Sequence, residues 1–141
     1  MEMIRRYALV LALVLACPFA RAADEEIDVK SAMTVAEAWL AGVDAGRYGA
    51  SWDEAAKLFQ GAIERTKWEV TIERVRGPLG VAITRKLRSA NHTRTLPNAP
   101  PGEYIVIQYD TVFENRPLST EIVTPMREPD GTWKVSGYII R

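Results

Sequence analysis

The sequence predicts an α+β fold, in which three N-terminal helices pack on a four-stranded antiparallel sheet. Apolar residues recur at helical spacing between residues 32 and 79, and alternating patterns typical of strands begin at residue 83. Turn-forming residues separate the strands, so that consecutive strands can pair as a meander. Helices gathered on one side of such a sheet are typical of the α+β class.

Each expected helix begins with a hydroxyl residue three positions before a glutamate. The pairs are Thr34 and Glu37, Ser51 and Glu54, and Thr66 and Glu69. This is the spacing of a capping box, in which the two side chains satisfy backbone N–H groups of the first turn. We expect Gly46 to end the first helix and Gly77-Pro78 to end the third.

Four strands are expected after the helices, at residues 83–95, 103–113, 120–126 and 132–140. Strand alternation places Tyr109 and Asp110 on opposite faces of the second strand. Pro125 lacks a backbone N–H, and it therefore indicates an edge strand or a bulge at that position.

The N-terminus has the pattern of a secretory signal. Arg5 and Arg6 precede an apolar run over 8–16, and Ala20-Arg21-Ala22 supplies the small residues of a cleavage site. We expect a signal peptide over 1–22, a flexible lead-in over 23–31 and a single domain over 32–141. This pattern predicts an exported protein, periplasmic or secreted.

Cys17 leaves an alternative to simple cleavage. It ends a stretch, Val14-Leu15-Ala16-Cys17, that loosely matches a bacterial lipobox. Lipidation there would make the protein a lipoprotein anchored at a membrane face, and membrane association is expected only in that case. Cys17 is also the only cysteine, so a chain cut after Ala22 has no disulfide.

Composition and motifs argue against several function classes. The chain has 18 Lys and Arg against 18 Asp and Glu, whereas nucleic-acid binding needs an excess of positive charge. The sequence has neither a P-loop nor a dinucleotide fingerprint, so we expect no cofactor. His92 is the only histidine and has no neighbours at metal-ligand spacing, so we expect no metal site.

Several spaced motifs resemble a known family. They are Ala38-Trp39-Leu40, Asp44-x-Gly46-x-Tyr48 with Ser51-Trp52, Arg76-Gly77-Pro78-Leu79-Gly80 with Arg85-Lys86-Leu87, residues 102–113, Val123-Thr124-Pro125-Met126 and residues 133–138. Over about residues 32–141 the chain is similar to the exported bacterial family catalogued as domain of unknown function 4019. The resemblance implies a cone-like fold of the nuclear-transport-factor-2-like type, with helices covering a curved sheet. It implies no activity, because this fold serves enzymes and binding modules alike.

The candidate catalytic residue is Asp110, since a carboxylate in an apolar pocket can exchange protons with a substrate. Tyr109 could stabilise an oxyanion, but alternation places it on the other face of the strand. The candidate ligand-binding residues are Tyr109, Trp133, Tyr138 and Arg85, which we expect around a pocket on the concave face of the sheet. Trp133 could equally be a core residue, and the basic stretch around Arg85 could equally be a solvated surface.

We therefore expect a non-catalytic binding or protein-interaction module of the bacterial envelope. Its expected partners are a small apolar or acidic ligand and a second copy paired through the sheet. One alternative is a small cofactor-independent isomerase or dehydratase that uses Asp110, and another is a lipid-anchored assembly factor attached at Cys17.

Overall fold

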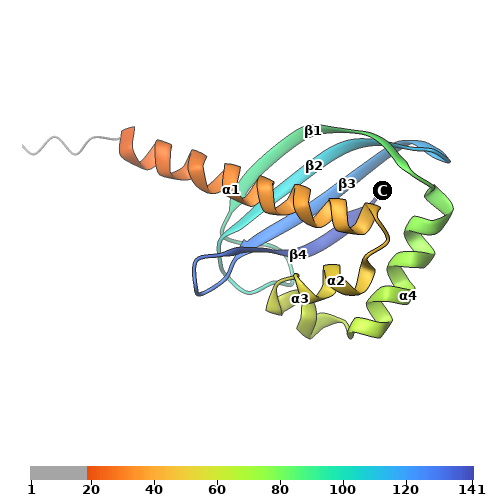
Figure 1. The fold of residues 1–141 in the computed structure, drawn as a ribbon. Coiled ribbons are helices and arrows are strands. Elements are labelled where there is room, and N and C mark those ends of the chain that lie inside the picture. Colours follow the sequence, from red (N-terminus) through yellow and green to blue (C-terminus); the bar gives the residue numbers. More distant parts are fainter. Residues whose placement is uncertain (1–18) are drawn as a thin grey trace, which may run out of the picture.

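The computed structural model describes residues 19–141, with side chains from Asp28 onward. Four α-helices precede a short 3₁₀-helix and four strands (Figure 1). The elements are α1 (Phe19–Asp44), α2 (Tyr48–Asp53), α3 (Lys57–Ala62), α4 (Arg65–Arg76), η1 (Gly77–Leu79), β1 (Ala82–Thr93), β2 (Tyr104–Phe113), β3 (Arg116–Arg127) and β4 (Trp133–Ile140). Cys17 and most of the expected signal peptide lie outside the described residues.

The four strands form one antiparallel meander in the order β1-β2-β3-β4. Helix α1 lies across one face of this sheet (Figure 1), which we call the inner face. The inner face carries Ile107 and Tyr109 of β2, which pair with Val123 and Glu121 of β3. The opposite, outer face carries partly exposed side chains such as Asp110. This arrangement confirms the predicted α+β class.

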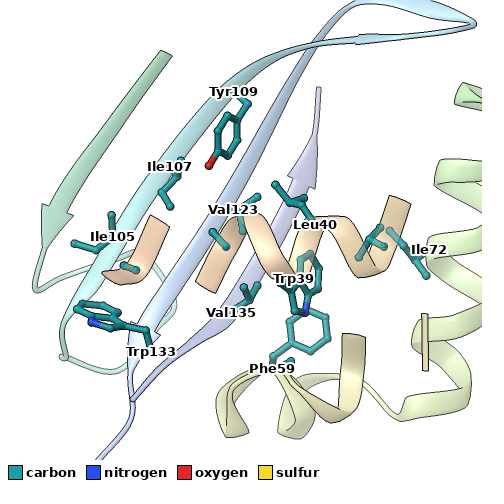
Figure 2. Packing of buried hydrophobic residues seen from close by; sticks show 14 of the residues in the cluster. Trp39, Leu40, Phe59, Ile72, Ile105, Ile107, Tyr109, Val123, Trp133 and Val135 are labelled. Carbon is teal, nitrogen blue, oxygen red and sulfur yellow. The ribbon is translucent and has the colours of Figure 1, made fainter. Parts of the chain in front are cut away.

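The hydrophobic core fills the space between α1 and the inner face (Figure 2). Small residues, Ala32 and Ala36, recur every four positions along α1, and they let the helix backbone approach the sheet closely. The larger members of the core come from α1, from α3 and α4, and from the sheet; they are Trp39, Leu40, Val43, Phe59, Trp68, Ile72, Ile105, Ile107, Val123, Trp133 and Val135.

Helix α1 begins earlier than the sequence analysis expects. It includes residues 23–31, where a flexible lead-in is predicted, and the structure has this segment helical. The stretch 23–41 contains neither Gly nor Pro, so nothing in it stops the helix from extending toward its N-terminus. Thr34 is consequently inside the helix, where its hydroxyl donates to the Lys30 carbonyl at 3.1 Å instead of capping.

The second expected helix is divided into α2 and α3. Residues 54–56 lie between them, and the Ala56 N–H donates to the Val135 carbonyl of β4 at 2.8 Å. Docking of this segment against the sheet replaces the helical hydrogen bond that would have joined the two helices. Ser51 lies within α2, where its hydroxyl donates to the Tyr48 carbonyl at 2.6 Å and accepts from Trp68 Nε1 at 2.9 Å.

Two local predictions about chain breaks are confirmed. The register of β3 against β4 shifts between Thr124 and Pro125, as expected for a bulge at the proline. Gly46 ends α1 with φ of 74°. The N–H of Arg47 donates to the Gly42 carbonyl and the N–H of Gly46 to the Val43 carbonyl, each at 2.9 Å, which is a Schellman motif.

Substituting Gly46 by alanine tests this helix end. An added Cβ would contact nothing within 4 Å, so the cost is that of the left-handed backbone alone. We expect Gly46→Ala to lower the free energy of unfolding by about 1 kcal/mol in urea denaturation. The matched control is Gly42→Ala, which also meets open space but lies within α1. It should raise stability by up to about 1 kcal/mol, and equal effects of the two substitutions would contradict this account.

Candidate functional site

A cluster of charged and hydroxyl side chains joins the inner face of the sheet to the C-terminal ends of α1 and α4. We call it the inner ion cluster. Its members are Asp44, Arg76, Arg85, Thr111, Glu121 and Tyr138. They come from α1, α4 and all four strands, so the cluster forms only when the whole domain is folded.

Glu121 is the most deeply buried charged residue of the cluster, with 0% of its surface exposed. Its Oε1 accepts hydrogen bonds from Arg85 Nε at 2.7 Å and from the Thr111 hydroxyl at 2.6 Å. Its Oε2 accepts a short hydrogen bond from the Tyr138 hydroxyl. Both carboxylate oxygens are therefore engaged, as a carboxylate removed from water requires.

Tyr138 is held in its neutral form by this environment. Burial raises the pKa of its hydroxyl, and the nearby Glu121 carboxylate raises that pKa further. The group therefore stays protonated at neutral pH and acts as a donor to Glu121.

Asp44 receives two guanidinium groups at the end of α1. Arg85 binds it through two bonds, Nη1 to Oδ2 at 2.8 Å and Nη2 to Oδ1 at 3.0 Å, while Arg76 Nη2 lies 2.7 Å from Oδ1. Burial alone would raise the pKa of the Asp44 carboxyl, but the hydrogen bonds from Arg85 and Arg76 outweigh it and hold that pKa below its usual value. Asp44 is therefore ionised at neutral pH.

Arg76 crosses from α4 to the sheet and is only 5% exposed. Its guanidinium carbon lies 4.9 Å from the centre of the Phe113 ring, in a cation–π contact. Its Nη1 lies 3.5 Å from the Tyr138 hydroxyl. Its Nε is buried and has no hydrogen-bond partner among the described residues, which leaves one donor of the cluster unused.

Tyr109 lies on β2 directly opposite Glu121 and packs among the apolar residues under α1 (Figure 2). Its hydroxyl is a second buried polar group without a partner in residues 28–141. Burial raises the pKa of this hydroxyl, and the negative charge of Glu37 adds to the effect.

The four expected ligand-binding residues have different positions. Arg85 and Tyr138 meet at Glu121, and Tyr109 lies beside them on the same face. Trp133 lies at the other end of β4, packed in the core near Ile105 (Figure 2).

Asp44, Arg76 and Glu121 were not predicted from the sequence to be functional residues. The sequence did contain a signal for Glu121. It lies two residues before Val123 and four before Pro125, so it shares the inner face of β3 with them. A carboxylate at such a position needs a buried partner.

Asp110 lies on the outer face, away from the inner ion cluster. It forms a short salt bridge with Arg88, and both side chains are about half exposed. The pair borders a depression of about 300 Å³ that also includes Val112, Pro117 and Leu118. The predicted separation of Asp110 from Tyr109 is confirmed by the burial pattern of β2.

His92 lies near the other end of β1, next to Glu103, which also binds Arg94 at 3.1 Å. Within the described part of the chain, no group of three His, Cys, Asp or Glu side chains is arranged to hold a metal ion.

Neutralising Glu121 tests whether the inner ion cluster depends on its charge. Glu121→Gln keeps the side-chain size but removes the buried carboxylate charge that Arg85 contacts, so that Arg85 keeps only the partly exposed Asp44 as a counter-charge. We expect the free energy of unfolding to fall by about 3 kcal/mol in chemical denaturation. The control, Asp110→Asn, breaks an exposed pair and should cost no more than about 1 kcal/mol. Similar losses for both variants would contradict the central role of Glu121.

Comparison with known proteins identifies the family. No curated protein and no solved structure matches the chain significantly. In residues 19–141, no helix combines the length and apolar character needed to cross a membrane. Residues 35–138 match the family described as "Protein of unknown function (DUF4019)", and this range includes the whole inner ion cluster. With most of its length matched, the chain belongs to this family of unknown function, DUF4019.

Proposed function

We propose that this protein is an exported, non-catalytic binding or protein-interaction module of the bacterial envelope. The observation that carries this proposal is that the carboxylates of the inner ion cluster are already engaged. Asp44 binds two arginines, and Glu121 accepts three hydrogen bonds. A general acid or base must instead be within hydrogen-bond reach of a substrate proton. Carboxylates held in this way support structure and recognition better than proton transfer.

The enzymatic alternative depends on Asp110. This residue forms a salt bridge with Arg88 on the outer face, and the nearest tyrosine in the sequence, Tyr109, points to the inner face. An isomerase or dehydratase mechanism needs an acid or base and an oxyanion donor around one substrate atom. Asp110 and Tyr109 do not share such a space, which favours the binding module.

The outer face is the surface that we propose for pairing with a second copy. It carries Leu118, which is 92% exposed, beside the depression at Val112 and Pro117. A protruding side chain next to a hollow can be self-complementary about a two-fold axis, because each copy offers both. The four strands have 12, 10, 12 and 8 residues, so the sheet spans roughly 19 by 33 Å, or about 600 Å². That area is close to the roughly 800 Å² per partner of a typical stable interface.

Analytical ultracentrifugation of the protein from residue 23 onward tests this pairing. We expect a dimer, and we expect Leu118→Glu to shift it to a monomer because it places a charge within the apolar part of the interface. Val70→Glu is the matched control, since Val70 is 56% exposed on α4 and away from the sheet. It should leave the dimer intact. A monomeric unsubstituted protein, or a dimer that survives Leu118→Glu, would rule out this surface.

Native mass spectrometry of the protein isolated from the envelope of a bacterium that expresses the full chain tests export. We expect a chain that begins at Ala23, because the small residues before it fit a signal peptidase site. Lipidated Cys17 as the first residue would instead support the membrane-anchored assembly factor. An uncut chain recovered with the cytoplasmic fraction would contradict export in either form.

A further inference from the structure

Two arginines of the inner ion cluster converge on one point. Arg76 and Arg85 come from α4 and β1, and both reach the Asp44 carboxylate within 3.0 Å. Two guanidinium groups this close, both largely shielded from water, repel each other strongly unless an anion lies between them. The point where the two guanidinium groups meet therefore requires an anion, and Asp44 occupies it in this structure.

Both arginines keep other anchors that do not involve Asp44. Arg85 Nε binds Glu121 at 2.7 Å, and Arg76 stacks over Phe113 and approaches Tyr138. The guanidinium groups are consequently held in place from the side of the sheet. A site whose donors are already oriented binds an anion without a further ordering cost.

Asp44 does not use the site completely. A carboxylate can bind side-on to the Nε and Nη2 donors of an arginine. Asp44 binds Arg76 only through Nη2, because it turns both oxygens toward Arg85, and Arg76 Nε stays buried without a partner. The Asp44 side chain is also 29% exposed, and Asp44 is the last residue of α1, where the helix dipole disfavours a negative charge.

From this geometry we infer that a small carboxylate ligand with an apolar body binds between Arg76 and Arg85 in place of Asp44. A free carboxylate is not tied to α1, and it can therefore engage Arg76 through both Nε and Nη2. The apolar body would lie along Leu87, which is on the same strand face as Arg85 and is 45% exposed. This inference rests on the proposal that the domain is a binding module, and it names the class of ligand.

Butyrate is a suitable probe because it combines a carboxylate with a short apolar chain. The experiment follows the Nε–H resonances of Arg76 and Arg85 in ¹⁵N-labelled protein during titration with sodium butyrate. Butyramide, which has the same shape without the charge, and sodium chloride at equal ionic strength are the control ligands. We expect a saturable shift with butyrate alone. Equal responses to butyrate and chloride, or no saturable response up to 100 mM butyrate, would overturn the inference.

Three variants separate the site from general charge effects. Arg76→Lys removes the side-on pair of donors and should weaken butyrate binding at least tenfold. Asp44→Asn removes the internal competitor at constant size and should tighten binding several-fold. Arg88→Lys alters an arginine of the outer face and should leave binding unchanged. Unchanged binding in Arg76→Lys would overturn the inference, and the unsubstituted protein decides the question if a variant fails to fold.

The two proposals can fail separately. Absence of butyrate binding in a protein that still dimerises through Leu118 would remove the carboxylate site and keep the interaction module. Loss of the dimer alone would leave the carboxylate site as the binding function of the domain.

Discussion

The ion pair between Arg85 and Glu121 connects the edge strand β1 to the interior of the sheet across β2. Thr111 of β2 lies between them and donates to the same carboxylate oxygen. Because Glu121 is fully buried, its charge is tolerable only if these donors are in place. The register of three strands, the end of α1 and the position of α4 are all tied to this one carboxylate through Arg85, Asp44 and Arg76.

The rest of the domain satisfies its buried polar groups in a similar manner. Trp39 donates its indole N–H to the Ser51 carbonyl at 2.8 Å, and Trp68 donates to the Ser51 hydroxyl. Ser51 thus links α1, α2 and α4 beneath a cluster of aromatic rings in which Phe59 and Trp68 meet edge to face at 4.8 Å. The helices are therefore fixed by specific hydrogen bonds in addition to apolar packing.

Features set by neighbouring residues could be predicted from the sequence, whereas features set by contacts between distant parts of the chain could not. The strand over 103–113 was predictable because alternation reports directly which side chains are buried. The helix starts expected at Thr34 and Ser51 were not predictable in this way. At Thr34 a local cap competes with continuation of the helix, and at Ser51 it competes with a tertiary contact to Trp68. Glu121 was missed because Arg85 faces it only as a result of strand register, which bulges in β1 help to set.

The balance of charge also bears on the two binding surfaces that we propose. The inner ion cluster contains two arginines and two carboxylates, and the whole chain has no net charge, so no strong long-range field directs a ligand to it. Recognition at such a site depends on short-range geometry, namely the fork of Arg76 and the fixed direction of Arg85. The outer face, where Leu118 protrudes, depends mainly on shape and apolar contact. Under the two proposals, the two faces of one sheet serve two different kinds of partner, an anion on the inner side and a second copy of the chain on the outer side.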